Sequence, residues 1–169
     1  MSGASGRILF VCTGNIFRSL TADVAQTRLL ASREDIHVSS AGTADHPHIV
    51  WSYVREYLLL KGFDVSSHGR RTLTRAIMDE SDLVVAMSTD HQAFIRERFG
   101  REVPLYLEVC GEAAAWLPDI EDVIPDYQTN TAAVEAHVRR TIDRIVELAP
   151  RMAENVDSLM RKYGRRDGQ

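Results

Sequence analysis

The chain has 169 residues, of which 44% are hydrophobic and 26% charged, and its formal net charge is -4. This length and composition are those of one globular domain with a proper core, and the charge gives no general reason to expect nucleic acid as a partner. No apolar run is long enough for a membrane span, and the small, polar start before Arg7 lacks the pattern of a signal peptide.

Cysteine usage indicates a reducing compartment. The chain holds two cysteines, Cys12 and Cys110, which do not form a disulfide framework. A cytoplasmic location suits such a chain. No Cys/His spacing indicates a metal site, and nothing in the sequence calls for a cofactor.

Strand and helix patterns alternate along the chain, which predicts a parallel sheet with helices on both faces. The apolar run at 83–87 is typical of a strand buried on both faces, whereas Pro104 places the last strand at an edge. We therefore expect a single α/β domain with about four strands and a loop after the first strand that binds phosphate. The predicted strands are 8–11, 36–40, 83–87 and 103–107, and the predicted helices are 18–31, 49–60, 73–78, 89–99 and 131 to beyond 146.

The domain boundaries follow from this pattern. Residues 1–6 are expected to be disordered, and residues 7–150 to form the folded domain. Pro150 should kink or interrupt the last helix. Residues 151–169 are then the end of that helix and a basic tail, which is expected to be frayed, with a basic docking arm as the alternative.

The most informative segment lies between the first predicted strand and helix. Cys12 ends the strand, and Arg18 begins the helix six residues later. Unpaired N–H groups at a helix N-terminus bind phosphate, and the same dipoles stabilise a thiolate. Gly14 and Asn15 tolerate positive φ, which a loop with converging amides needs. A thiolate, loop amides and a guanidinium together predict attack on phosphate monoesters, although a lone cysteine beside an apolar strand is more often an inert core residue.

From Arg7 to about Leu148 the chain resembles the low-molecular-weight protein tyrosine phosphatases. Their signature, Cys-x5-Arg-Ser/Thr after the first strand, reads CTGNIFRS here. Further matching segments follow in the family's order. They are Ser40-Ala41-Gly42-Thr43, Ser67-His68-Gly69-Arg70-Arg71, Asp82-Leu83-Val84-Val85-Ala86-Met87 with His91 on the next helix, and Ile124-Pro125-Asp126.

The resemblance implies a role for each matching residue. Cys12 would be the nucleophile, Arg18 would hold the phosphoryl oxygens, and Asp126 would be the general acid, with Asp122 as the alternative. Asn15, Ser40 and His68 would hydrogen-bond to one another and hold the loop in shape. The residues expected to contact substrate are Thr13, Gly14, Asn15, Ile16, Phe17, Ser19, His46 and Tyr127.

The chain also departs from the family pattern. Phe17 stands where many members carry a second loop cysteine, and Tyr127 follows Asp126 where the family has proline. His46 occupies the wall position that is usually aromatic, with Trp51 the nearest indole. Ile16 favours an aryl substrate, because relatives that act on phosphoarginine tend to carry threonine at this position.

The resemblance thus implies a phosphatase that hydrolyses phosphotyrosine in proteins through a phosphocysteine intermediate. Its partners would be phosphotyrosine proteins, a tyrosine kinase being one candidate, and the chain would be a monomer or a weak homo-oligomer. The alternatives are a phosphoarginine phosphatase, a thiol-dependent arsenate reductase, for which Cys110 is the only candidate resolving thiol, and a catalytically silent phosphate-binding module.

Overall fold

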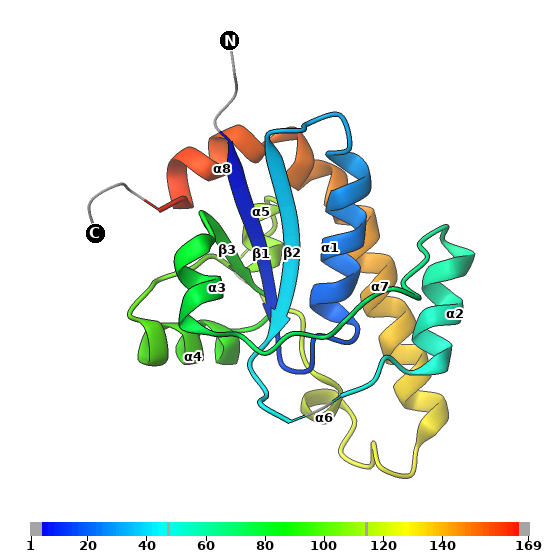
Figure 1. The fold of residues 1–169 in the computed structure, drawn as a ribbon. Helices are drawn as coiled ribbons and strands as arrows, with labels where there is room; N and C mark the ends of the chain where they lie inside the picture. Colours follow the sequence, from blue (N-terminus) through cyan, green and yellow to red (C-terminus); the bar gives the residue numbers. More distant parts are fainter. Residues whose placement is uncertain (1–4, 47, 114, 166–169) are drawn as a thin grey trace.

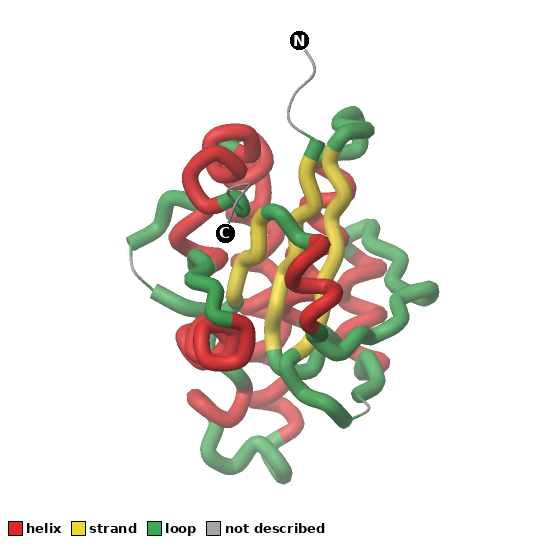
Figure 2. The backbone as a smooth tube through the Cα atoms, turned by 60° about the vertical axis from the view of Figure 1, so that its left-hand side comes forward, coloured by secondary structure: helices red, strands yellow, loops and turns green. Residues whose placement is uncertain are grey.

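The fold is a three-layer α/β sandwich, described by a computed structural model for residues 5–46, 48–113 and 115–165. Three parallel strands, β1 (Gly6–Cys12), β2 (Ile36–Gly42) and β3 (Leu83–Ala86), form a sheet in the order β2-β1-β3. Helices cover both faces of this sheet (Figures 1 and 2). The helices are α1 (Arg18–Leu29), α2 (Ser52–Leu60), α3 (Arg75–Glu80), α4 (Thr89–Phe99), α5 (Tyr106–Val109), α6 (Ile120–Val123), α7 (Thr131–Glu154) and α8 (Val156–Tyr163).

Alternation along β1 divides the core into two sides. Ile8, Phe10 and Cys12 pack on the side that holds parts of α5, α7 and α8. Leu9 and Val11 point the other way and pack with residues of α3 and α4. Side chains on successive strand residues point to opposite faces, so both sides of this central strand are buried.

The fourth predicted strand is reduced to one bridge. Leu105 pairs with Ala86 in parallel, and the Ala86 N–H donates to the Pro104 carbonyl at 2.9 Å. The chain then enters α5 at Tyr106, so no ladder develops. Pro104 has no N–H to donate, which is consistent with its expected position at the edge of the sheet.

The last long helix continues through Pro150 to Glu154, where a kink or break was predicted. Leu148, Ala149 and Met152 are fully buried around the proline. The buried side-chain amide of Gln26 donates to the Ala149 carbonyl at 2.8 Å. Packing on both sides of Pro150 therefore keeps the chain helical despite its missing N–H.

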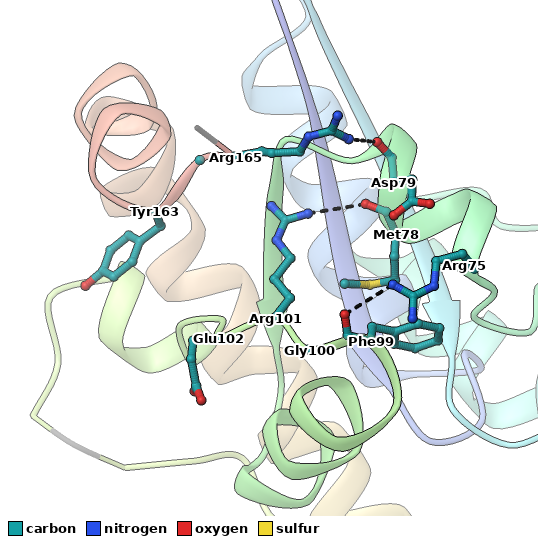
Figure 3. Close-up of a pocket in the computed structure, with 10 residues that line it drawn as sticks. Arg75, Met78, Asp79, Phe99, Gly100, Arg101, Glu102, Tyr163 and Arg165 are labelled. Carbon is teal, nitrogen blue, oxygen red and sulfur yellow. Dashed lines mark hydrogen bonds between the residues drawn. The ribbon is translucent and has the colours of Figure 1, made fainter. Parts of the chain in front are cut away.

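Val156–Tyr163 form a separate helix, α8, where the sequence predicted the end of the last helix and, from Arg161, a frayed tail. Tyr163 donates its hydroxyl proton to Glu108 at 2.8 Å, and the Arg165 N–H donates to the Asp82 carbonyl at 2.9 Å. The Arg165 side chain donates to the Asp79 carbonyl, beside Arg101, which donates to the Met78 carbonyl (Figure 3). The carbonyl groups around the end of α3 thus hold the chain as far as Arg165, and residues 166–169 lie outside the described part.

These arginines line a cavity of about 680 Å³ between the ends of α3, α4 and α8 (Figure 3). Residues Gly6 and Leu83 begin their strands at this edge of the sheet, whereas Cys12 lies at the opposite, carboxyl edge. Ligands of open α/β sheets bind beyond the carboxyl edge. We therefore expect the functional site at the end of β1, beside Cys12.

Candidate active site

The loop between β1 and α1 wraps around the Cys12 sulfur. The Asn15 backbone N–H donates to Cys12 Sγ at 3.3 Å, and Ser19 Oγ lies 2.9 Å from the same sulfur. Asn15 adopts a φ of 56°, in the left-handed region that Asn tolerates better than most residues. The sequence predicted this loop and this tolerance, and the structure brings Cys12 and Ser19 together at its centre.

Asn15 is the main brace of the loop. Its side-chain amide donates to Ser19 Oγ at 2.9 Å, and its Oδ1 accepts the Arg71 N–H at 3.1 Å. Nε2 of His68 lies 2.9 Å from the Asn15 carbonyl. Two groups of Asn15, its Oδ1 and its carbonyl, therefore join the loop to the segment around His68 and Arg71, while its side-chain amide braces Ser19 within the loop.

Ser40 reaches the loop only through its neighbours. Its hydroxyl donates to Asp23 at 2.8 Å, and its carbonyl accepts Arg71 Nε at 3.2 Å. Burial raises the pKa of Asp23, while the Ser40 hydrogen bond opposes that shift. Ser40 thus holds the side chain of Arg71, whereas Arg71 and Asn15 make the direct contact.

Gly42 allows the second strand to approach the loop closely. A Cβ at this position would lie 2.5 Å from the Thr13 carbonyl oxygen. The Thr43 N–H donates to the Cys12 carbonyl at 2.9 Å across the same gap. Any side chain at 42 would push the loop away from the sheet, so Gly42 is needed for this geometry.

Arg18 is almost fully buried, with 1% of its surface exposed. One terminal nitrogen donates to the Leu117 carbonyl at 3.0 Å, and the other lies 2.5 Å from Asp119 Oδ2. Nε is buried without a hydrogen-bond partner among the described residues. A buried guanidinium with a free donor beside a cysteine can hold two oxygens of a phosphoryl group.

Asp119 contacts the loop through its carboxylate, although the sequence pointed to Asp126 or Asp122 as the acid of the site. Its Oδ2 accepts from Arg18 and, at 3.2 Å, from the Thr13 hydroxyl. Its Oδ1 accepts the Ile120 N–H at 2.8 Å at the start of α6. A carboxylate that faces Arg18 and Thr13 lies at the mouth of the loop, where a leaving group would depart.

Asp126, the predicted general acid, does not line the pocket, so this placement is a correction. It is exposed, and its Oδ2 accepts from the Asn130 side chain at 3.0 Å in the turn before α7. Asp122, the alternative, accepts the Asp119 N–H at 2.8 Å and is also exposed. Asp122 thus caps the start of α6, and Asp126 stabilises the turn before α7. Asp126 does not line the pocket, because α6 turns the chain ahead of Ile124-Pro125-Asp126.

The pocket in front of Cys12 has a volume of about 250 Å³ and a largely apolar wall. The predicted contact residues Thr13, Gly14, Ile16, Phe17 and Tyr127 all line it. Cys12 and Arg18 line it as well. The other lining residues were not among the predicted contacts, and they are His48, Trp51, Asp119, Ile120, Glu121 and Val134.

His46 is a second correction. Its side chain is 69% exposed and it does not line the pocket. His48 lies in the wall instead, and its Nδ1 is 3.0 Å from the His46 carbonyl. A count along the sequence does not reveal which of the two histidines lines the pocket.

Thr13 is also linked to α4. Its Oγ1 lies 2.9 Å from Nε2 of His91, and Nδ1 of His91 accepts the Ser88 N–H at 3.1 Å. Burial, with a further contribution from Arg18, lowers the pKa of His91 to about 3. His91 is therefore a neutral imidazole around neutral pH.

The second cysteine, Cys110, does not line the pocket. Cys110 is 1% exposed at the end of α5, and burial raises its pKa to about 12.

Within the described residues, no group of three or more His, Cys, Asp or Glu side chains could hold a metal ion. No helix in that part of the chain is long and apolar enough to cross a membrane.

Comparison with known proteins places this geometry among phosphatases. Residues 7–162 match the family model described as low molecular weight phosphotyrosine protein phosphatase. Over 102 residues the chain is 35% identical to the protein-arginine-phosphatase of Bacillus subtilis, a match that covers 56% of this chain and 63% of that relative. The chain thus matches less than two thirds of the length of this relative.

Solved structures agree along more of the chain. A YwlE mutant from Bacillus subtilis is 28% identical with a TM-score of 0.71, covering 90% of this chain and 99% of that one. The low molecular weight protein tyrosine phosphatase from T. tengcongensis is 25% identical with a TM-score of 0.73, covering 89% of this chain and 99% of that one. The shared architecture therefore extends over nearly the whole chain.

Proposed function

The chain belongs to the low molecular weight phosphotyrosine protein phosphatase family, and from this premise we propose that it hydrolyses phosphotyrosine in proteins. Cys12 attacks phosphorus, the bond to the tyrosyl oxygen breaks, and Asp119 gives that oxygen its proton. Water then attacks the phosphocysteine, its proton passes to Asp119, and the thiolate is released with inorganic phosphate. One ester and one water thus yield one phenol and one phosphate.

The contacts of the loop support this division of roles. The Asn15 N–H and the Ser19 hydroxyl both lie against Cys12 Sγ, where they stabilise a thiolate. Arg18 begins α1, and its buried guanidinium can meet the charge on the phosphoryl oxygens with donors fixed in advance.

Asp119 is the general acid in this proposal, in place of Asp126. Its Oδ2 is within hydrogen-bond distance of both Arg18 and Thr13, whereas Asp126 accepts from Asn130 in an exposed turn. A general acid must reach the proton acceptor directly or through one water. Only Asp119 of the two lines the pocket.

The apolar contact made by Ile16 carries the choice of substrate. Its side chain is 5% exposed and lines the pocket together with Trp51 and Tyr127. This wall offers a flat aryl ring an apolar surface. Because position 16 is isoleucine, the wall has no hydroxyl there to form a hydrogen bond with the guanidinium of phosphoarginine.

Phosphoarginine is the second candidate substrate, because the matching relative from Bacillus subtilis is named a protein-arginine-phosphatase. Glu121 and Asp119 also line the pocket, and carboxylates can bind a guanidinium. Phosphotyrosine favours an apolar side chain at position 16, whereas phosphoarginine favours a hydroxyl there. Position 16 therefore distinguishes the two candidates.

The test compares kcat/KM for a phosphotyrosine peptide and a phosphoarginine peptide of the same flanking sequence. We expect the wild-type chain to prefer phosphotyrosine by at least about tenfold, the scale set by one apolar contact. Ile16→Thr should reduce that preference, whereas Ile16→Val should keep it. Cys12→Ser should be inactive on both peptides. Equal values for the two peptides in the wild type would refute the assignment.

A further inference from the structure

We infer that His91 is a positioning residue for the general acid, acting through the Thr13 hydroxyl. The inference rests on the proposed function, in which Asp119 protonates the leaving group. Three side chains from three parts of the chain take part: His91 on α4, Thr13 in the phosphate loop and Asp119 at the start of α6.

The direction of each hydrogen bond follows from the partners. The Ser88 backbone N–H can only donate, so Nδ1 of His91 accepts it at 3.1 Å. A neutral imidazole then carries its proton on Nε2, which donates to Thr13 Oγ1 at 2.9 Å. The Thr13 hydroxyl proton is left to point at Asp119 Oδ2, 3.2 Å away. The backbone of α4 thus fixes the orientation of a hydroxyl beside the catalytic carboxyl group.

The burial of His91 makes this arrangement stiff. The residue is 3% exposed and closes a capping box with Ser88 at the N-terminus of α4. Its position is therefore set by the helix and by the core beneath it. A surface histidine would offer the same proton without the same orientation, because its ring would be free to turn.

Substrate binding gives the Thr13 contact its importance. A phosphoryl group in the loop competes for Arg18, which is also the partner of Asp119 Oδ2. When Arg18 turns to the phosphoryl oxygens, the Thr13 hydroxyl still holds Asp119 in place. A misplacement of about 1 Å at this point can cost about a hundredfold in rate.

The experiment uses two aryl phosphates that differ in their need for an acid. Para-nitrophenolate leaves readily without a proton, whereas phenolate needs one. A positioning defect should therefore lower kcat/KM, which reports the steps up to departure of the leaving group, more for phenyl phosphate than for para-nitrophenyl phosphate. We expect this ratio of the two kcat/KM values to change about tenfold in Thr13→Val, which removes the hydroxyl but keeps the shape. The matched Thr13→Ser should keep the wild-type ratio.

Two variants separate the functions of the imidazole. In His91→Gln the amide N–H group can still reach Thr13, but the acceptor of the Ser88 N–H is displaced. In His91→Asn the acceptor near Ser88 remains, and the reach to Thr13 is lost. We expect His91→Asn to change the ratio for the two aryl phosphates as Thr13→Val does. In His91→Gln this ratio should stay within about threefold of the wild-type value. The Thr13 pair decides the question if either histidine variant fails to fold.

Asp119→Asn separates this inference from the proposed function. If Asp119→Asn leaves the ratio unchanged, the acid assignment is wrong and the inference falls with it. If Asp119→Asn changes the ratio but Thr13→Val lowers both kcat/KM values equally, the acid assignment stands. Thr13 and His91 are then structural only, and the inference is overturned.

Discussion

At the scale of single residues, Asn15 carries much of the shape of the phosphate loop. It is fully buried, it adopts a positive φ, and its side chain joins Ser19 to the Arg71 backbone. Few residue types combine this backbone conformation with one donor and one acceptor at the right place. The loop therefore depends on Asn15 for its conformation as well as for its contact with the sulfur.

Replacing Asn15 should harm both stability and catalysis. Asn15→Ala leaves the Arg71 N–H and Ser19 without their partner, at about 1–3 kcal/mol for each buried group. We expect a lower midpoint of urea unfolding and a fall in kcat/KM of at least about tenfold. Asn130→Ala is the control, because Asn130 accepts the Ala133 N–H at the start of α7 and does not itself line the pocket. That variant should lose about 1 kcal/mol of stability and keep its kcat/KM. An Asn15→Ala enzyme of full activity would contradict the role of the brace.

The two candidate acids can be separated by substitution. Asp119→Asn should lower kcat for phosphotyrosine by about a hundredfold to ten-thousandfold, the usual contribution of general acid catalysis. Asp126→Asn should change kcat by less than about threefold, because its contact with Asn130 serves the turn before α7. Steady-state rates of both variants at several pH values check this expectation. A loss confined to Asp126→Asn would restore the assignment made from the sequence.

Residues of the loop were predictable, but their partners across the pocket were not. Cys12, Arg18 and Asn15 lie in one short segment whose spacing determines their geometry. Asp119 and His48 approach from irregular segments, where no period relates residue number to direction. Asp119 lines the pocket and Asp126 does not, because α6 turns the chain between them, and a helix of four residues leaves no repeating pattern in the sequence.

At the scale of elements, the longer helices and buried strands agree with their sequence patterns. The helix at Thr89–Phe99 has the predicted bounds and ends at Gly100, whose φ is 72°. The helices α5 and α6 have four residues each and were not predicted, since hydrophobic periodicity needs a longer window. α8 was not predicted as a separate helix, because residues after Pro150 were interpreted as the end of the last helix and the basic residues from Arg161 as a frayed tail.

The cap of α4 should make stability depend on pH. Burial lowers the pKa of His91 to about 3, against about 6.5 in an unfolded chain. Arg18 adds to this shift and Asp119 opposes it. Folding thus disfavours the protonated imidazole. Its contribution to stability is complete above about pH 6.5 and is lost as the pH falls towards 3, by up to about 1.4 kcal/mol per pH unit.

Urea unfolding at pH 4, 5 and 7 measures this dependence. His91→Gln should show a shallower loss of unfolding free energy between pH 7 and pH 4 than the wild type. His37→Gln, which changes an exposed histidine on β2, should follow the wild-type curve. Parallel curves for wild type and His91→Gln would show that other groups dominate the acid side.

The contribution of α8 can be tested at one position. Leu159 is 9% exposed and packs in the core beside β1, whereas Leu60 at the end of α2 is 83% exposed. Leu159→Ala should lower the free energy of unfolding by about 2–4 kcal/mol, and Leu60→Ala by less than about 0.5 kcal/mol. Chemical denaturation of both variants checks the difference. Equal effects would mean that α8 adds little to the fold.

At the scale of the whole molecule, the sheet gathers the site from distant parts of the chain. β1 and β2 end side by side, with Cys12 opposite Gly42, and the chain after β3 brings His91 and then Asp119 to the same edge (Figure 1). The alternation of strands and helices predicted this edge as the place of chemistry. It did not predict which loop residues meet there, because that depends on packing between loops.

The same architecture separates the two thiols chemically. Both cysteines are buried, but Cys12 lines the pocket and Cys110 does not, and the raised pKa of Cys110, about 12, keeps it a thiol. Phe17 holds the loop position where many family members have a second cysteine, and it is buried among residues of α2 and α7. Oxidised Cys12 therefore has no neighbouring loop thiol with which to form a disulfide.

Peroxide treatment should thus inactivate the enzyme with incomplete recovery. Without a neighbouring thiol, the sulfenic acid at Cys12 is oxidised further by peroxide to sulfinic acid, which dithiothreitol does not reduce. Phe17→Cys should restore recovery by supplying the missing thiol, at some cost in stability from the lost packing, and Cys110→Ser should behave like the wild type. Mass spectrometry of the Cys12 peptide and the activity regained after dithiothreitol measure both effects. A Cys12–Cys110 disulfide with full recovery in the wild type would refute this expectation, and would mean that the buried thiol reaches the site once Cys12 is oxidised.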